Sequence, residues 1–381
     1  MTMSPISAES RGSAVDDVER AIKDFVAEVL LEGEPVEFDE HTPLLEHRLI
    51  DSLNVEELLV YVEQTFSVSL SRWPHSDWKT IHAMAQLVHD HAPDGRQAPG
   101  EQPAAIVSDY EKWVAGYWNE KQNDPINLLL GEEDGLVHHH YGLGEYDPAV
   151  LTAPDQEDAI IRELHRLECA QMDVVLDALA PMTADQRLLD AGSGRGGGSF
   201  SAHRRFGCRA DGITLSQYQV DFATKLAARH GCTDEVSFHL QNMTRTAFPD
   251  DHFDRIITNE TTMYVELADA FAEFARVLKP GGRYVCVTYC VNDTLAPTSE
   301  ACEAVDAHYG TRMHKRSEYL AALSAAGFSP SRVSVLNADT IPYWELRARS
   351  EHSTGVEKAF LDGYRSNVLQ YVLIVADRLP A

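Results

Sequence analysis

The chain has 381 residues and a formal net charge of −28, from 60 acidic and 32 basic side chains. Such an acidic chain is repelled by nucleic acid and by anionic membrane surfaces, which excludes both as expected partners. The length predicts two or three domains, and a hydrophobic content of 44% is enough to give each a core.

The cysteines and the N-terminal segment indicate the compartment. Six cysteines lie scattered through the second half of the chain without a CxxC pair, which predicts free thiols in a reducing environment. The first residues show no apolar run behind basic ones, and no run approaches the about 18 apolar residues of a membrane span. We therefore expect a cytoplasmic protein without a membrane-spanning segment.

The N-terminal quarter is the most acidic part of the chain. Residues 1–100 carry 19 acidic and 7 basic side chains. Apolar residues recur there at helical spacing in three stretches, 15–29, 55–66 and 78–88, which predicts a small all-α bundle over residues 13–91. Proline and glycine are frequent in residues 92–109, which predicts a linker, and residues 110–381 form a second predicted domain.

Ser52 lies at the start of the second predicted helix, within the sequence Asp51-Ser52-Leu53. Unpaired backbone N–H groups and the positive end of the helix dipole would stabilise a phosphate ester there. An ordinary N-cap would also explain a serine at this position.

Residues 13–91 resemble acyl and peptidyl carrier proteins, in which 4'-phosphopantetheine is attached to the serine of a D-S-L motif that follows a TPL-type loop. The resemblance implies Ser52 as the attachment site and a phosphopantetheinyl transferase as a partner. Ile50 stands where the family usually has glycine. A docking or structural domain that carries no prosthetic group is the alternative interpretation.

Downstream of the linker, strand-like and helix-like segments alternate. Short apolar or β-branched runs predict strands at 188–194, 210–216, 255–260, 283–291 and 369–378. The alternation predicts an α/β fold, with a largely parallel sheet covered by helices on both faces.

The first of these strands leads into a glycine-rich turn. Asp190 ends the strand, and Gly192, Gly194 and Gly196 follow, so the backbone can approach a ligand closely. The spacing departs from the dinucleotide-binding pattern, which also requires an acid where Thr214 stands. Together with RVLKPGGRYV at 276–285, the turn resembles the class I S-adenosylmethionine (SAM) methyltransferases, which implies that Asp190 and the glycines bind SAM.

Two further segments extend this resemblance. The stretch from Gly212 to Gln219 resembles a subgroup that contains cyclopropane fatty acid synthases and some C-methyltransferases, in which Thr214 and Gln219 would face the ribose. In the family, the adenine of SAM lies after the third strand of the sheet, and the resemblance places Asn242 and Met243 there. A helix cap and a solvated helix face are the alternatives for Thr214 and Gln219.

Residues 110–378 as a whole resemble geranyl diphosphate C-methyltransferases. The blocks that carry this resemblance include HHHYG at 138–142 and NETTMY at 259–264. It implies methylation of an alkene carbon of a short prenyl diphosphate, most directly geranyl diphosphate, through a carbocation and proton loss, in terpenoid secondary metabolism. Isopentenyl diphosphate, farnesyl diphosphate and a substrate tethered to the N-terminal domain remain open.

The resemblance also assigns residues to the reaction. Glu260 ends the predicted strand at 255–260 and would act as the base or as the anion that opposes the cation. Tyr309 takes the place of a family aromatic, usually phenylalanine, that faces the cation, and Tyr141 resembles a residue near the substrate. A helix-capping carboxylate and core packing are the alternatives for these residues.

Histidines and a basic island are the predicted diphosphate ligands. His138 and His139 belong to a triplet whose adjacent side chains cannot all face one ion, so we expect hydrogen-bond donors rather than metal ligands. Arg312, Lys315 and Arg316 lie in a stretch free of acids, 307–317, that is either an anion site or a solvated helix face. Mg²⁺ would be held mainly by the diphosphate, with no predicted protein ligand. The sequence leaves open whether the chain forms a homo-oligomer.

Overall fold

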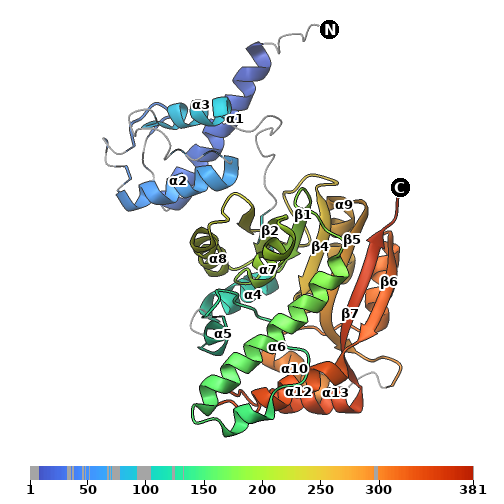
Figure 1. The fold of residues 1–381 in the computed structure, drawn as a ribbon. Helices are drawn as coiled ribbons and strands as arrows, with labels where there is room; N and C mark the ends of the chain where they lie inside the picture. Colours follow the sequence, from blue (N-terminus) through green and yellow to red (C-terminus); the bar gives the residue numbers. More distant parts are fainter. Residues whose placement is uncertain are drawn as a thin grey trace. The chain divides into compact units, whose positions relative to one another are not determined.

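The chain forms two compact units, residues 1–102 and 103–381 (Figure 1). The computed structural model describes residues 8–31, 36, 38–44, 47, 49–50, 52–66, 68, 70, 78–91, 104–121, 125–131, 133–295 and 299–380. Among these residues, no helix combines the length and the apolar character that a membrane crossing requires.

The smaller unit consists of helices packed around one apolar core. These are α1 (Ala8–Phe25), which continues into a π-helical turn (Val26–Leu30), α2 (Ser52–Phe66) and α3 (Ile81–His91). Ile22, Leu58 and Val62 have no exposed surface in this core. Each helix lies where the apolar spacing predicts one, and α2 begins at Ser52. Asp51 and linker residues 92–103 lie outside the described residues.

The larger unit is built on a seven-stranded sheet with the order β3-β2-β1-β4-β5-β7-β6 (Figure 1). The strands are β1 (Arg187–Ala191), β2 (Arg209–Thr214), β3 (Val236–Leu240), β4 (Phe253–Asn259), β5 (Leu278–Val291), β6 (Phe328–Val335) and β7 (Leu369–Arg378). The first five in chain order are parallel, and β7 pairs antiparallel with both β5 and β6. The predicted α/β fold with a largely parallel sheet is confirmed.

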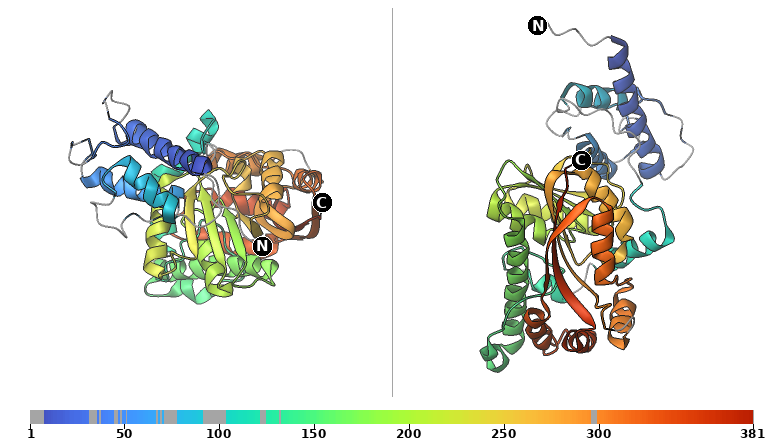
Figure 2. Two further views of the ribbon diagram at one scale, coloured as in Figure 1. Left: turned by 90° about the horizontal axis from the view of Figure 1, so that it is seen from above. Right: turned by 90° about the vertical axis from the view of Figure 1, so that its right-hand side faces the viewer.

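Helices cover both faces of this sheet (Figure 2). They are α4 (Asp109–Glu120), α5 (Pro125–Leu129), α6 (Gln156–Leu179), α7 (Gly197–Phe206), α8 (Gln217–His230), α9 (Leu267–Val277), α10 (Glu300–Tyr309), α11 (Arg316–Ala325), α12 (Asn337–Arg347) and α13 (Glu357–Ser366). The side chains of β1 alternate between two cores: Leu188 packs with residues of α6, and Leu189 packs with residues of α9 and α11. Helix α4 begins at Asp109, inside the predicted linker, because Ser108 caps it in a capping box with Glu111.

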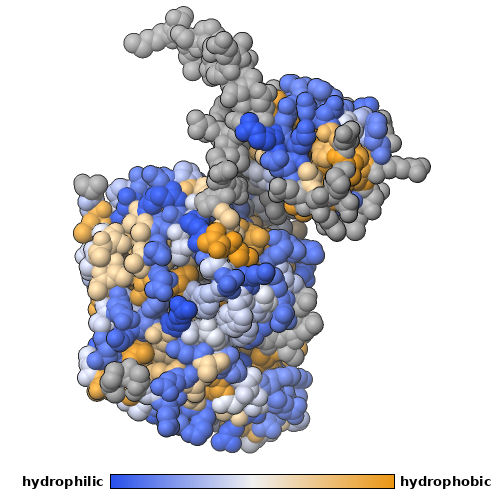
Figure 3. All heavy atoms as spheres, turned by 180° about the vertical axis from the view of Figure 1, so that it is seen from behind, coloured by the Kyte–Doolittle hydropathy of each residue, from blue (hydrophilic) through white to orange (hydrophobic). Residues whose placement is uncertain are grey.

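The surface of the larger unit has no broad apolar band on the face that Figure 3 shows. Hydrophobic side chains lie there in small groups separated by hydrophilic ones. In the described part of this unit, the large apolar residues that are exposed are likewise scattered along the sequence. Among them are Val107, Trp113, Leu240 and Leu295.

Candidate active site

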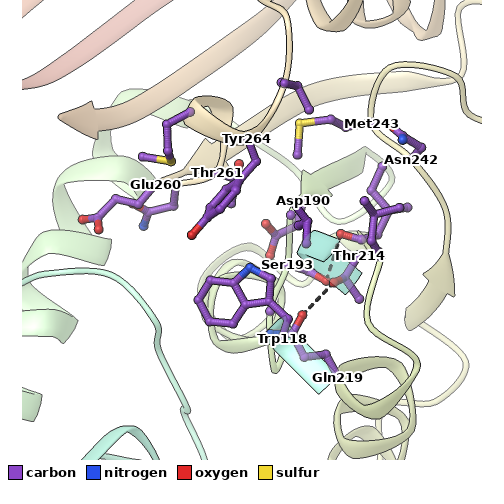
Figure 4. Close-up of a pocket in the computed structure, with 18 of the residues that line it drawn as sticks. Trp118, Asp190, Ser193, Thr214, Gln219, Asn242, Met243, Glu260, Thr261 and Tyr264 are labelled. Carbon is purple, nitrogen blue, oxygen red and sulfur yellow. Dashed lines mark hydrogen bonds between the residues drawn. The ribbon is translucent and has the colours of Figure 1, made fainter. Parts of the chain in front are cut away.

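A cavity of about 340 Å³ opens at the carboxyl ends of β1, β2 and β4 (Figure 4). Ligands of open α/β sheets bind at this edge. The structure brings many of the predicted site residues together in its wall, namely His138, His139, Asp190, Gly192, Gly194, Thr214, Gln219, Asn242, Met243, Glu260 and Arg312.

The glycine-rich turn forms part of the cavity wall, and its backbone leaves little room for side chains. Gly192 has φ +89° and Gly194 has φ +54°, both in the left-handed region. A Cβ atom on Gly192 would lie 2.4 Å from Cγ2 of Thr261. Gly196 does not line the cavity; a Cβ there would lie 2.6 Å from the Phe238 ring, so core packing explains this glycine.

Asp190 and Thr214 end neighbouring strands and hold buried polar groups toward the cavity. The carboxylate of Asp190 accepts a hydrogen bond of 2.8 Å from the Ser199 hydroxyl, and burial raises its pKa to about 6. The Thr214 hydroxyl donates to Gln219 Oε1 over 2.6 Å. Gln219 is 4% exposed and so does not lie on a solvated helix face. Ser216, not Thr214, caps α8.

The loop after β3 is tied to the segment that precedes α4. Asn242 is buried, and its side-chain amide donates to Glu111 Oε1 over 2.8 Å and to the Ala105 carbonyl over 3.2 Å. Arg245 forms an ion pair of 2.7 Å with the same Glu111 carboxylate. The start of α4 is thereby held against the loop that places Asn242 and Met243 at the cavity. Nothing in the local sequence around Glu111 indicates this role.

Glu260 follows the last residue of β4 and is 9% exposed. Its φ of +56° is unusual for a residue with a side chain, a conformation that costs about 1–3 kcal/mol and is found at functional sites. Oε1 accepts hydrogen bonds from the Tyr141 backbone N–H, over 3.0 Å, and from the Tyr371 hydroxyl. Burial raises the pKa of Glu260 to about 8, although these two hydrogen bonds oppose the shift.

Further side chains hold Tyr371 in turn. The Tyr371 hydroxyl accepts a hydrogen bond of 3.0 Å from Gln171 on α6. The side-chain amides of Gln171 and Asn259 pair reciprocally, over 2.8 and 3.0 Å. One carboxylate oxygen of Glu260 is therefore fixed by elements that are far apart in the sequence, β7 and α6. Neither Tyr371 nor Gln171 was predicted as a site residue from the sequence.

Aromatic rings stand beside the carboxylate. In Figure 4, Glu260 lies on one side of the Trp118 and Tyr264 rings, and Asp190 and Thr214 lie on the other. The Trp118 and Tyr264 ring centroids are 6.2 Å apart at an interplanar angle of 76°. Tyr264 belongs to the NETTMY block at 259–264, although neither ring was assigned a role from the sequence.

Tyr141 and Tyr309 do not line the cavity. Tyr141 is buried among other rings, with centroids 4.4 Å from Trp344 and 5.0 Å from Phe360. Its hydroxyl is hydrogen-bonded to that of Tyr309, whose ring lies 6.3 Å from Phe360. The Tyr141 side chain therefore packs in the core, while its backbone N–H reaches Glu260.

His138 and His140 are buried, and His139 is partly exposed. Desolvation lowers the pKa of His138 and His139 well below the usual value and that of His140 to about 4. His139 Nε2 accepts a hydrogen bond of 2.8 Å from Arg195. A neutral imidazole still offers one N–H donor, so these side chains can donate to an anion without carrying charge.

The structure separates the members of the basic island. Arg312 lines the cavity, with its guanidinium 4.9 Å from the centroid of the Tyr110 ring. Lys315 precedes α11 and pairs with Glu318 over 3.5 Å, and Arg316 donates to Gln370. Neither lines the cavity, because the chain turns into α11 at this point. Lys121, which the sequence analysis did not consider, lies 5.6 Å from the Tyr309 ring.

Comparisons with known proteins identify this architecture. A family profile described as a methyltransferase domain matches residues 189–286. The geranyl diphosphate 2-C-methyltransferase of Saccharopolyspora erythraea is 47% identical over 275 residues, which cover 72% of this chain and 96% of that protein. The Streptomyces coelicolor enzyme of the same name is 45% identical over 278 residues, which cover 72% and 95%.

A solved structure gives the same result. It is the crystal structure of the geranyl diphosphate C-methyltransferase from Streptomyces coelicolor A3(2), in complex with Mg²⁺, geranyl-S-thiolodiphosphate and S-adenosyl-L-homocysteine. At 45% identity it superposes with a TM-score of 0.70 and covers 73% of this chain and all of that one. The chain is therefore a SAM-dependent C-methyltransferase and belongs to the geranyl diphosphate 2-C-methyltransferase family.

Proposed function

We propose that this chain methylates an alkene carbon of geranyl diphosphate with SAM, as a step of terpenoid secondary metabolism. One observation carries the proposal: a buried carboxylate, Glu260, lines the same cavity as the Trp118 and Tyr264 rings and the glycine-rich turn. Chemistry that passes through a carbocation needs both an anion and aromatic faces in a site that excludes water.

The residues present fit SAM. Gly192 and Gly194 line the cavity without side chains, so the backbone there can approach the cofactor closely. We assign Asp190 and Thr214 with Gln219 to the polar groups of the cofactor, and Asn242 with Met243 to its adenine. When bound, SAM supplies an electrophilic methyl group on a sulfonium.

Glu260 and the neighbouring rings would control the carbocation and the loss of its proton. The alkene π electrons form the new carbon–carbon bond as the carbon–sulfur bond breaks, which leaves a cation on the substrate. The faces of Trp118 and Tyr264 stabilise that charge by about 0.5–2 kcal/mol each. A neighbouring C–H bond then gives its electrons to a new double bond, and its proton passes to the ionised Glu260. Tyr309 and Tyr141 would shape the cavity from the adjacent core.

For the diphosphate, the geometry favours Arg312 and His139. Both line the cavity, as His138 does, whereas Lys315 and Arg316 lie outside it with partners of their own. Among the described residues, no group of three potential metal ligands occurs at this cavity. We propose that Mg²⁺ is carried mainly by diphosphate oxygens and water, the ligands it prefers.

A panel of acceptors tests the proposal. The chain is incubated with SAM, Mg²⁺ and isopentenyl, geranyl or farnesyl diphosphate, and the dephosphorylated products are identified by mass. The geranyl compound should give the highest kcat/KM. Preference for the shorter or longer acceptor would support the same chemistry on a different substrate, and methylation of none of the three would refute the proposal.

For the N-terminal region, we propose a domain at 13–91 that resembles carrier proteins and is joined by a linker at 92–109 to the methyltransferase domain at 110–381. The start of α2 at Ser52 and the shared helical core support it. Intact mass after incubation with a phosphopantetheinyl transferase and coenzyme A tests attachment. An adduct that Ser52→Ala abolishes would support a carrier, which would also permit a tethered substrate; no adduct would favour a docking domain.

A further inference from the structure

A second group of chemically distinctive side chains lies apart from the wall residues that would hold SAM. His165 and Cys169 are four residues apart on α6 and therefore project from the same side of that helix. Asp134, from the turn before residues 136–144, lies against them. One ligand atom from each of the three side chains lies within 4.8 Å of the other two, and among the described residues no other group of three meets this condition.

One distance within the group matches the spacing between ligands of one tetrahedral metal ion, and a second is slightly shorter. His165 Nε2 lies 3.1 Å from Asp134 Oδ1 and 3.6 Å from Cys169 Sγ. Bonds of about 2.0–2.3 Å from zinc to nitrogen, oxygen and sulfur place such ligand atoms about 3.3–3.7 Å apart at tetrahedral angles. Asp134 Oδ1 also accepts a hydrogen bond of 2.9 Å from the Leu136 N–H, which orients the carboxylate.

His138 supplies an independent observation. It is 2% exposed, and its Nε2 points at the same thiol, 3.9 Å from Cys169 Sγ. Within the described residues its Nδ1 has no hydrogen-bond partner, an uncommon state for a buried polar atom. His138 therefore borders the group through Cys169, but it is not one of the three side chains whose ligand atoms all lie within 4.8 Å of one another.

We infer that Asp134, His165 and Cys169 bind one Zn²⁺ ion, with a water molecule in the fourth position. Thiolate and imidazole ligands select zinc and cobalt over Mg²⁺, which prefers oxygen, so this site differs from the diphosphate-bound metal. Binding converts the Cys169 thiol to a thiolate and releases its proton to solvent, with no change of oxidation state.

The ion would fasten two parts of the active site together. His138 is followed directly by His139, which lines the cavity, and α6 carries Gln171, which supports Tyr371. A metal bridge between α6 and Asp134, four residues before His138, would therefore hold the segment that leads into the histidines in place against the helix. The role is structural, because none of the proposed ligands contacts Glu260 among the described interactions.

Cobalt binding to the full-length chain without an affinity tag tests the inference. Metal-depleted protein is titrated with Co²⁺, and the thiolate-to-cobalt charge-transfer band and the visible d–d bands are recorded. One equivalent should produce both with tetrahedral intensity, and Zn²⁺ should displace it. Cys169→Ser should abolish the charge-transfer band and weaken Zn²⁺ binding by more than about tenfold.

Matched variants separate this site from other histidines and thiols. Cys232→Ser changes a buried thiol that belongs to no such group among the described residues, and its titration should match that of the wild type. His165→Asn should lose the tetrahedral spectrum, while retained SAM binding shows that each variant is folded. A wild-type titration without a charge-transfer band, or a band that persists in Cys169→Ser, would overturn the inference whether or not the chain methylates geranyl diphosphate.

Discussion

Removal of the Tyr371 hydroxyl should shift the pH dependence of methylation. In the wild type, burial holds the pKa of Glu260 at about 8, and the Tyr371 hydrogen bond lowers it by stabilising the carboxylate. Only the ionised carboxylate can accept the proton, so activity should rise with pH through this pKa. In Tyr371→Phe the carboxylate loses that stabilisation and its pKa rises further.

The size of the effect depends on the bond that is lost. A hydrogen bond to a charged group contributes about 1.5–3 kcal/mol. One pH unit corresponds to about 1.4 kcal/mol, so the pKa should rise by about one to two pH units. At pH 7 the ionised fraction, and with it kcat/KM, should fall about ten- to a hundredfold, and much of the loss should be recovered at high pH.

The assay is the pH profile of kcat/KM for geranyl diphosphate at saturating SAM. The bound sulfonium lowers the pKa of Glu260 in both proteins, so the displacement between the two profiles is the informative quantity. Tyr364→Phe is the matched control, because within the described residues the buried Tyr364 hydroxyl has no hydrogen-bond partner. The pH profile of Tyr364→Phe should coincide with that of the wild type. Coincident profiles for Tyr371→Phe and wild type, or a displacement to lower pH, would refute the reasoning.

Further variants test other parts of the site. Glu260→Gln should retain SAM affinity in calorimetry while kcat falls by about 10²–10⁴-fold, and a wild-type kcat would remove this residue from the mechanism. Gly192→Ala, at φ +89° with a Cβ 2.4 Å from Thr261, should lose SAM affinity and about 1–3 kcal/mol of unfolding free energy. Gly231→Ala, at φ +68° in open space, should leave SAM affinity unchanged. An equal loss of SAM affinity in Gly192→Ala and Gly231→Ala would show that backbone strain alone is responsible. Arg312→Met should raise the KM for geranyl diphosphate about tenfold or more, because a hydrogen bond between charged groups is lost, whereas Lys315→Met should not raise it. A larger increase in KM for Lys315→Met than for Arg312→Met would place the diphosphate outside the cavity.

Features encoded by local sequence were predictable. The strand, the acid and the glycine turn around Asp190 occupy consecutive positions, so their meeting at the sheet edge is a consequence of the parallel topology. Glu260 was identified for the same reason, as the residue after a strand. Strand β6 was missed because Ser329, Pro330 and Ser331 interrupt the apolar pattern that marks a strand, which an edge position tolerates.

Features that depend on tertiary pairing were not predictable. Tyr371 reaches Glu260 only because β7 inserts antiparallel beside β5, and the sequence of a uniformly apolar strand does not reveal which side chain faces the site. Charge density along the chain identified the basic island as a whole. It could not show that the backbone N–H of Arg312 pairs with Met263 beside the cavity while α11 carries Arg316 away.

The central claim is that the cavity around Glu260 methylates an alkene carbon of geranyl diphosphate. The most direct measurement incubates the full-length chain with geranyl diphosphate, Mg²⁺ and SAM deuterated in its methyl group, with mass spectrometry and NMR of the dephosphorylated alcohol as the readout. We predict a product with one intact CD₃ group on an alkene carbon and one substrate proton lost. Unchanged geraniol, or a label found on oxygen, would contradict the claim.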